Sequence, residues 1–526
     1  MASPDGHPSG TGRCPERVAP TGRPPDLATG EREAYVPTGM GQIPLFGLGY
    51  VLLALGLSLD VLLHKDRPVS AVLWLGILWI APYAGALAYL AFGMDRVRRG
   101  ARERQMARTL LTRTAHLGPG LADHVLEVPA ESRLAASDRL GWHILRGTDP
   151  AVPGHRVLVG NDARLLVDGD EFYPALRAAI EEARHTIHLQ TFIFAVDRTG
   201  QEIRDLLARR AGEGIKVRLL YDRFGSATAH VRRFFEPARR SGVRVHSISQ
   251  ANPLKGRFQI NLRNHRKVAV MDGQVAFVGG INIADSNVAA FTDDRPIRDY
   301  HVRIEGPAVA DIQLGFLEDW YFASREPPER LLGPDSLPEF HHAGEALIQV
   351  VPGGPEPAGR GLADAFFAAI VAAEESIDIT TPYFVPDQPI IRALRYAAHR
   401  GVRVRLVVPA KNNHWYTGFA ARALYSRLLG VGVRIFERRP PFMHAKSLVV
   451  DGVYAMLGSA NLDYRSLHLN FETNVEVVDP GFVSAVSRQV ETEITASREV
   501  TREAHAARPL PRKLLENFCR LFEPVL

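Results

Sequence analysis

The stretch HRKVAVMD at residues 265–272 returns as HAKSLVVD at residues 444–451. Both copies place a histidine, a lysine and an aspartate at the spacing H-x-K-x4-D, with mostly apolar residues between the lysine and the aspartate. Each copy is followed by a turn that contains glycine and then by an asparagine, Asn282 in the first and Asn461 in the second. A short apolar run bounded by a turn predicts a buried strand, and a unit that occurs twice predicts two similar halves.

The sequence around each copy alternates helical and apolar segments in the same order. The first half predicts a helix at 171–183, a strand at 186–194, a helix at 201–210 and a strand at 216–221. The second half predicts a helix at 362–374, a strand at 376–384, a helix at 389–399 and a strand at 403–408. Helices that alternate with buried strands indicate an α/β fold. We expect two α/β/α sandwich halves with pseudo-two-fold symmetry, one active site at their seam, and a proline-rich link at 325–339.

Two apolar runs precede this repeat. Residues 43–63 are uncharged except for Asp60, and residues 69–93 carry no charge. Each run has about the 20 residues that a helix needs to cross a bilayer, so the pair predicts a transmembrane helical hairpin. The arginines at 96–108 outnumber the basic residues of the intervening turn, which places both ends of the hairpin in the cytoplasm. The alternative is a pair of helices buried in a soluble core.

These patterns divide the chain into six segments. They are a disordered tail at 1–40, a transmembrane hairpin at 41–94, a juxtamembrane basic linker at 95–154, a first half at 155–330, a second half at 331–500 and a C-terminal amphipathic segment at 501–526. In the last segment, Leu514, Leu515, Phe518, Leu521 and Phe522 share one helical face. This face is expected either to pack onto the catalytic core or to lie in the membrane interface.

Composition sets weaker limits on function. The 526 residues include 63 basic and 58 acidic side chains, a net charge of +5. A mildly basic chain suits nucleic acid, an anionic membrane or a phosphate-bearing substrate without choosing among them. Cys14 and Cys519 are the only cysteines, which argues against a disulfide framework and against a zinc site.

The paired motifs contain the groups that phosphoryl transfer needs in the absence of a metal ion. One histidine can attack phosphorus and form a covalent intermediate. The other can protonate the leaving alkoxide and then deprotonate the incoming alcohol, because an imidazole pKa near 6.5 suits both tasks. The two lysines would supply the positive charge that magnesium supplies in other enzymes, and Asn282 and Asn461 would donate to the same phosphoryl oxygens. The sequence has no carboxylate cluster suited to magnesium, so we expect neither a metal nor a cofactor.

The candidate catalytic set comprises both complete motifs, His265, Lys267, Asp272, His444, Lys446 and Asp451. Two residues that are two apart on a strand face the same side, so each histidine and its lysine should point to one place. The aspartates stand an odd number of residues beyond their histidines. We therefore interpret the aspartates as structural partners of charges or turns rather than as groups that touch substrate.

The paired motif resembles that of the phospholipase D superfamily, and from about residue 43 onward the chain is similar to bacterial cardiolipin synthases with two N-terminal transmembrane segments. The stretches that carry this likeness are residues 74–78, 89–93, 168–172, 264–267, 277–282, 381–386, 442–446, 461–466 and 520–524. The resemblance implies two phospholipase D-like halves. It also implies that Asp299 and Glu472 hydrogen-bond the active histidines and orient them.

The same resemblance implies an activity, which is to join two phosphatidylglycerol molecules into cardiolipin and release glycerol. His265 would be the nucleophile and His444 the general acid and base, and the near symmetry of the motifs leaves the reverse assignment open. The implied partners are phosphatidylglycerol and anionic membrane lipids, and not nucleic acid. The implied location is the bacterial inner membrane, as a multi-pass protein with its catalytic domain in the cytoplasm.

Two other functions use the same residues. In a hydrolase of the superfamily, either a phospholipase or a nuclease, water would attack the phosphohistidine. The predicted transmembrane hairpin argues against a nuclease. A catalytically silent membrane scaffold would not need an intact set of histidines, lysines and asparagines in both halves. Three places depart from the family pattern and bear on the choice of acceptor: Gln190, the run at 296–298 that lacks a tryptophan before Asp299, and the loop at 411–414.

Overall fold

The computed structural model describes residues 42–65, 68–81, 83–90, 125, 136–148, 156–248, 263–293, 295–332, 335–355 and 361–523. The chain divides into two compact units, Met1–Met94 and Asp95–Leu526. The predicted tail at 1–40 and the arginines at 96–108 lie outside the described residues.

The described residues of the N-terminal unit form three helices, α1 (Gln42–His64), α2 (Pro68–Ile80) and α3 (Ala84–Ala88). Helix α1 has 23 residues, which gives a length of about 34 Å against a hydrocarbon core of about 30 Å. Among the described helices, α1 alone contains a stretch, Gly47–His64, that is long and apolar enough to cross a membrane.

The second apolar run does not form the single long helix that we predicted. Helix α2 ends at Ile80 after 13 residues, and α3 begins at Ala84. The sequence has Pro82 between them, and proline ends helices because it lacks an N–H group and its ring clashes with the preceding turn. The expected pair of uninterrupted spans is therefore corrected to one helix of spanning length followed by a broken segment.

The polar groups of the N-terminal unit find partners inside the unit. The hydroxyl group of Tyr89 donates to Asp60 Oδ2 at 2.7 Å, and the Trp79 indole donates to Ser58 Oγ at 3.1 Å. An ionisable side chain in an apolar helix is costly unless it is paired in this way. Several leucines of α1 remain exposed on the outside of the unit, including Leu52 and Leu62, and such a surface suits contact with lipid.

The second unit, Asp95–Leu526, contains both repeated motifs and is called the catalytic unit below. Its described residues are built on one sheet of 15 strands. The first half supplies β1 (Leu158–Val167), β2 (Thr186–Thr191), β3 (Lys216–Asp222), β4 (Arg244–Ile248), β5 (Val268–Met271), β6 (Val275–Gly279) and β7 (Tyr300–Glu305). The second half supplies β8 (Ala346–Gly353), β9 (Ser376–Thr380), β11 (Arg403–Pro409), β12 (Arg434–Arg438), β13 (Ser447–Val450), β14 (Tyr454–Gly458), β16 (Glu472–Val478) and β17 (Ser497–Val500). The short strands β10 (Phe384–Val385) and β15 (Leu462–Asp463) pair separately.

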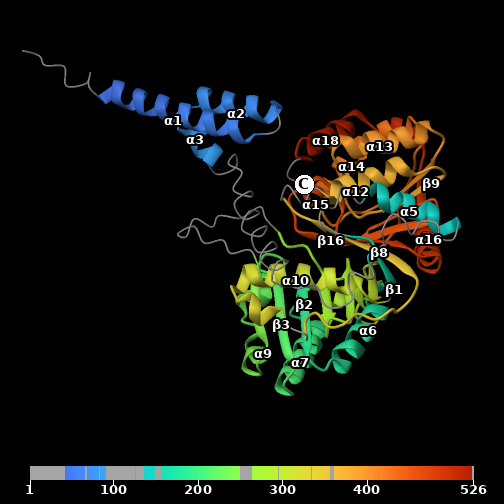
Figure 1. Ribbon diagram of the computed structural model, residues 1–526. Coiled ribbons are helices and arrows are strands. Elements are labelled where there is room, and N and C mark those ends of the chain that lie inside the picture. Colours follow the sequence, from blue (N-terminus) through green and yellow to red (C-terminus); the bar gives the residue numbers. More distant parts are fainter. Residues whose placement is uncertain are drawn as a thin grey trace, which may run out of the picture. The chain divides into compact units, whose positions relative to one another are not determined.

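The strand order confirms the predicted duplication. The first half runs β4-β3-β2-β5-β6-β7-β1, and the second runs β12-β11-β9-β13-β14-β16-β8 with β17 added at its edge. The two halves join where β1 pairs with β8 in antiparallel fashion, so the sheet is continuous across the seam (Figure 1). A pseudo-two-fold axis at this junction relates each strand to its partner in the other half.

Helices cover both faces of this sheet. They are α6 (Asp168–Glu182), α7 (Arg198–Gly212), α10 (Ala308–Ser324), α12 (Gly361–Ala372), α13 (Gln388–His399), α14 (Trp415–Leu429) and α16 (Pro480–Thr495). Helices α6 and α7 close one core of the first half, and α12 and α13 close the equivalent core of the second half. Helices α10 and α16 share a third core that spans both halves. The expected α/β/α sandwich is thereby confirmed.

Part of the predicted basic linker belongs to the catalytic unit. Residues 136–148 form helix α5 (Ala136–Thr148), whose Trp142 and Leu145 are buried in the core beneath α12. The hydroxyl group of Thr148 donates to the buried Glu476 of β16 at 2.8 Å. Helix α5 therefore packs with the folded second half, although it precedes residue 155, where the sequence predicts the start of the first half.

Candidate active site

Each histidine lies in an extended segment just before its strand rather than within it, because β5 begins at Val268 and β13 at Ser447. The segment of His265 pairs with the other half, since Asn264 forms a parallel bridge with Phe471. The amide of His265 donates to the carbonyl of Phe471 at 2.9 Å. Backbone pairing across the seam thus holds the first motif.

The second motif is held in the same way, by backbone pairing with a segment of the first half. Met443 forms a parallel bridge with Arg298, and the amide of His444 donates to the Arg298 carbonyl at 2.7 Å. Arg298 and Phe471 each stand immediately before a candidate orienting acid, Asp299 and Glu472. The two bridges therefore bring each histidine beside an acid of the other half.

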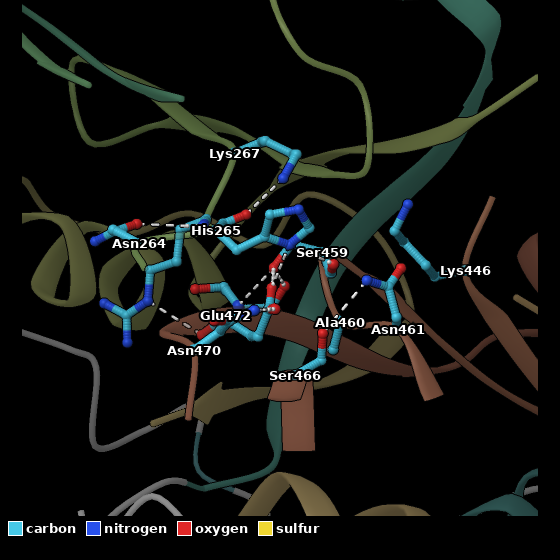
Figure 2. A network of polar contacts seen from close by, with 12 residues as sticks. Asn264, His265, Lys267, Lys446, Ser459, Ala460, Asn461, Ser466, Asn470 and Glu472 are labelled. Atoms are coloured by element: carbon cyan, nitrogen blue, oxygen red, sulfur yellow. Dashed lines mark hydrogen bonds and ion pairs between the residues drawn. The ribbon is translucent and has the colours of Figure 1, made fainter. Parts of the chain in front are cut away.

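The imidazole–carboxylate contacts cross between the halves. His265 Nδ1 lies 3.0 Å from Glu472 Oε2, and His444 Nδ1 lies 2.6 Å from Asp299 Oδ2. Figure 2 shows His265 against Glu472, with Lys267 and Lys446 nearby. A carboxylate on Nδ1 fixes the tautomer and leaves Nε2 for chemistry. Neither half contains a complete set of groups, so the structure assembles one composite site.

A serine and a glycine occupy equivalent places beside these two acids. Ser459 Oγ donates to Glu472 Oε2 at 2.6 Å. At Gly280 a Cβ atom would lie 2.2 Å from Asp299 Oδ1, so no side chain fits there. In the structure these small residues make room for the two acids.

Both lysines are buried beside the histidines. Lys267 Nζ donates to the carbonyl of His265 at 2.6 Å, and Lys446 Nζ lies 2.8 Å from His444 Nδ1 and 3.8 Å from Asp299 Oδ2. Burial lowers the pKa of Lys267 to about 7 and that of Lys446 to about 8. Without a bound anion, the two lysines therefore lose their protons, and the site its positive charge, close to neutral pH.

Burial lowers the histidine pKa values as well. The pKa of His444 falls to about 4, because of burial first and then because of the positive charge of Lys446. The pKa of His265 falls below 6.5, also through burial. A phosphodiester anion would reverse these shifts, because a nearby negative charge favours the protonated forms of lysine and histidine. The cluster is thus suited to an anionic ligand.

The two asparagines that follow the motifs differ in their contacts. Asn282 Oδ1 accepts a hydrogen bond from the amide of Ile193 at 3.0 Å, which fixes the orientation of its amide. Asn461 Nδ2 lies 3.4 Å from Ser466 Oγ, and its Oδ1 is buried without a hydrogen-bond partner among the described residues. Figure 2 shows Asn461 beside Lys446.

The aspartates of the motifs point elsewhere. Asp272 accepts from the amides of Arg184, His185 and Thr186 at 2.7 to 2.8 Å. Asp451 accepts from the amides of residues 374–376 at 2.6 to 2.8 Å. Each aspartate follows the far end of its strand, so we withdraw both from the catalytic set. Their contacts hold the starts of β2 and β9.

A buried polar network behind His265 was not anticipated from the sequence. Gln190 Nε2 lies 2.8 Å from Asn264 Oδ1 and 2.7 Å from Asp319 Oδ2, and Asn264 Nδ2 also donates to Asp319 at 2.7 Å. Arg266 completes the network with an ion pair to Asp319 at 3.1 Å. The only signal in the sequence was Gln190, which departs from the family pattern.

Aromatic rings flank the two histidines. The Phe192 ring lies 5.0 Å from the His265 ring, and the Tyr383 ring lies 6.2 Å from the His444 ring. Tyr383 also lies 5.6 Å from the exposed ring of His414. Among the described residues, no group of three or more His, Cys, Asp or Glu side chains is arranged to hold a metal ion.

Comparisons with known proteins agree with this architecture. The family described as cardiolipin synthase, PLD-like domain, matches residues 176–320 and 366–494, and the family described as phospholipase D-nuclease N-terminal matches residues 52–93. The chain is 37% identical to cardiolipin synthase A of Pseudomonas aeruginosa (strain LESB58) over 497 residues, which cover 93% of this chain and 98% of the relative. It is 33% identical to a cardiolipin synthase of Geobacillus kaustophilus (strain HTA426), covering 93% of this chain and 96% of the relative.

A solved structure shares the fold. Phosphatidylserine synthase from Haemophilus influenzae superimposes with a TM-score of 0.56 at 15% identity, covering 73% of this chain and 100% of the other. At this identity the likeness concerns the arrangement of the strands and helices.

Proposed function

The chain belongs to the phospholipase D-like cardiolipin synthases, and from this membership we propose that it makes cardiolipin from two phosphatidylglycerol molecules through a phosphatidyl-histidine intermediate. The observation that carries the proposal is the crossed pairing of His265 with Glu472 and of His444 with Asp299. This pairing gives one site two imidazoles with Nε2 free for chemistry.

In the first half-reaction, Nε2 of His265 attacks the phosphorus atom of one phosphatidylglycerol. A P–N bond forms, the bond from phosphorus to the glycerol oxygen breaks, and protonated His444 gives its Nε2 proton to that oxygen. Glycerol leaves, and the phosphatidyl group stays on His265. Lys267 and Lys446 stabilise the negative charge that gathers on the phosphoryl oxygens.

In the second half-reaction, neutral His444 removes the proton from the primary hydroxyl group of a second phosphatidylglycerol. That oxygen attacks phosphorus, the P–N bond breaks, and His265 returns to its neutral form as cardiolipin departs. We assign His265 as the nucleophile in line with the family, and the network of Gln190, Asn264 and Asp319 behind it supports this choice. A fixed backbone is an advantage for a group that must hold a covalent intermediate.

We also propose that the N-terminal unit anchors the enzyme in the bacterial inner membrane with the catalytic unit on the cytoplasmic side. Helix α1 has the length of a span. The arginines of residues 96–108 outnumber Lys65 and Arg67 of the turn, and basic residues favour the cytoplasmic side. In this arrangement the broken run at 69–93 returns the chain to the side from which α1 enters.

Phosphatidyl transfer can be distinguished from hydrolysis by its products. We expect proteoliposomes of the full chain, supplied with phosphatidylglycerol labelled in its acyl chains and in its terminal glycerol, to form cardiolipin and free glycerol in equal amounts. EDTA should leave this result unchanged, because the lysines supply the charge. Thin-layer chromatography and scintillation counting give the amounts. Phosphatidic acid without cardiolipin would identify a hydrolase instead.

The lysine pKa values predict how anion binding depends on pH. Lys267 and Lys446 lose their protons as the pH rises through about 7 and about 8, so the free site loses positive charge in this window. Diethyl phosphate, a monoanion throughout, should bind about tenfold or more weakly at about pH 9 than at about pH 6. Calorimetry should also show proton uptake on binding between about pH 7 and pH 8.

The control for this prediction is Lys267→Arg. Arginine stays protonated across the range, so this variant should lose less affinity between the two pH values than the parent enzyme does. If the parent enzyme bound diethyl phosphate with the same affinity at both pH values, the lowered pKa values of Lys267 and Lys446 would be contradicted.

A further inference from the structure

The C-terminal helix α18 (Leu510–Arg520) presents its apolar side to solvent. Leu510 is 67% exposed, Leu514 62% and Phe518 57%, while Glu516 is 1% exposed. An amphipathic helix on a soluble domain normally has the reverse orientation, with its apolar stripe toward the core. Packing of the apolar face onto the catalytic core, one of the two expectations from the sequence, is therefore wrong.

Polar contacts hold the helix in this orientation. The carboxylate of Glu516 forms ion pairs with Arg508 at 2.9 Å and with Arg512 at 3.3 Å. Lys513 Nζ donates to the carbonyl of Ala506 at 2.7 Å, and Cys519 is buried in a small core with Ala420 of α14. A buried charge that is paired in this way is costly to pull out. The outward direction of the apolar face is thus set by the fold.

The N-terminal end of α14 extends this surface with aromatic side chains. Helices α14 and α18 pack together in the second half (Figure 1). Trp415, the first residue of α14, is 60% exposed, and its ring lies 6.0 Å from Phe419, which packs against the core that contains Cys519. We call Leu510, Leu514, Leu515, Phe518, Leu521, Phe522 and Trp415 the apolar face.

A chain of ring contacts leads from the apolar face to the active site. The rings of Trp415 and Tyr416 lie 5.8 Å apart, and those of Tyr416 and His414 lie 5.7 Å apart. His414 in turn contacts Tyr383, whose ring lies 6.2 Å from that of the catalytic His444. The apolar face and the reacting groups therefore lie along one connected side of the second half.

We propose that the apolar face inserts into the interfacial layer of the bilayer and sets the active site at the depth of the lipid phosphates. The inference rests on the proposed function, because a lipid with two long acyl chains leaves the bilayer only at a high free-energy cost. Tryptophan and apolar side chains are typical of this layer.

The charge of α18 favours lipid over a second copy of the chain as the occupant of the apolar face. The helix carries three cations, Arg512, Lys513 and Arg520, against the single acid Glu516, and Arg512 remains 47% exposed despite its pairing with Glu516. A helix with a net positive charge and an exposed apolar side suits an anionic headgroup layer, whereas two positively charged helices would repel each other.

A fluorescent probe can test the insertion without reference to activity. We would replace Cys14 with serine and Cys519 with alanine, introduce Phe518→Cys in the full chain, and attach an environment-sensitive dye. In proteoliposomes the dye should shift to shorter wavelength and be quenched by brominated lipids. The matched control is Gln201→Cys, on an exposed position of α7, which Figure 1 shows at the far end of the first half.

Quenching at both positions or at neither would overturn the proposal. Disulfide formation between two copies through Phe518→Cys, with no quenching by lipid, would assign the face to a second copy instead. Because the probe does not report turnover, a protein that proves to hydrolyse phosphatidylglycerol can still show the quenching, and the two proposals can fail separately.

Turnover gives a second test. The double variant Leu514→Glu/Phe518→Glu should lower turnover on bilayer phosphatidylglycerol by about tenfold or more, since charge on the face opposes insertion. Turnover of short-chain phosphatidylglycerol dispersed in detergent should stay within about twofold, because neither side chain touches the reacting groups. The unfolding temperature should not change, since both positions are exposed. Equal losses on both substrates would contradict the proposal.

Discussion

Replacing either His265 or His444 with alanine is expected to lower cardiolipin synthesis by about 10³-fold or more. Each imidazole performs a step that no neighbouring group can take over, either attack on phosphorus or proton transfer to and from the glycerol oxygens. Turnover in proteoliposomes measures the loss, and circular dichroism shows whether the variants stay folded. The control is His399→Ala, at an exposed position at the end of α13, which should keep nearly full activity.

The same variants identify the nucleophile. With acyl-labelled phosphatidylglycerol, His444→Ala that is rapidly denatured in detergent at neutral pH should carry label on the protein after long incubation, because His265 can still attack slowly and the intermediate then lacks the base for its breakdown. His265→Ala should carry none. The opposite distribution would reverse the assignment. A tenth of the parent activity in either variant would refute a single site that needs both halves.

Removing the crossed carboxylates should have the next largest effect. Glu472→Gln and Asp299→Asn are each expected to lower turnover by about 10²-fold or more, because each amide can hold the wrong tautomer of its imidazole. The two variants should differ in mechanism. Loss of Glu472 impairs its partner His265 and should slow the formation of the labelled protein, whereas loss of Asp299 impairs His444, which acts in both half-reactions, and should slow both the formation and the breakdown of the labelled protein.

The pH dependence distinguishes a positioning role from a purely structural one. The Asp299 carboxylate raises the pKa of His444 against the effects of burial and of Lys446, so Asp299→Asn should lower that pKa further. Steps that need protonated His444 should then be lost at lower pH than in the parent enzyme. A variant that lost activity equally at every pH, with a lower unfolding temperature, would point to loss of structure alone.

Glu476→Gln is the matched control for these carboxylates. Glu476 is also fully buried on β16, but it accepts from Thr148 and Tyr454 at 2.8 Å and touches neither histidine. Its replacement should lower stability by about 1 to 3 kcal/mol through the altered hydrogen bonds. Turnover at a temperature where the variant is folded should stay within about threefold of the parent enzyme.

Several elements could be predicted because their signal is local. Strands β3 and β11 and helices α7 and α13 follow from apolar residues at the spacing of a strand or of one helix face, and the same order in both halves strengthens the interpretation. Helix α10 gives no such signal, because residues 308–313 are all buried and leave no polar stripe. Pro82, which stands in the sequence between Ile80 and Ala84, is a local signal for the break in the second apolar run.

Some of the active-site groups could likewise be predicted from local sequence, whereas their pairing could not. The histidines, lysines and asparagines follow from two repeated motifs, and the acids follow from the family resemblance. The sequence does not predict which acid contacts which histidine, because the partners lie far apart in the chain. His265 and Glu472 are separated by 207 residues, and His444 and Asp299 by 145. Asp272 and Asp451 share the motif with the histidines, yet they bind backbone amides at the opposite ends of their strands.

By itself the sequence determined that the protein has two equivalent halves and which side chains can perform phosphoryl transfer, because both are properties of short stretches and of their repetition. Only the tertiary structure decided that each half completes the site of the other, and that α18 turns its apolar side outward. Both outcomes depend on contacts between segments far apart in the chain. Such contacts are selected by the packing and pairing of the whole sheet, which no short stretch specifies.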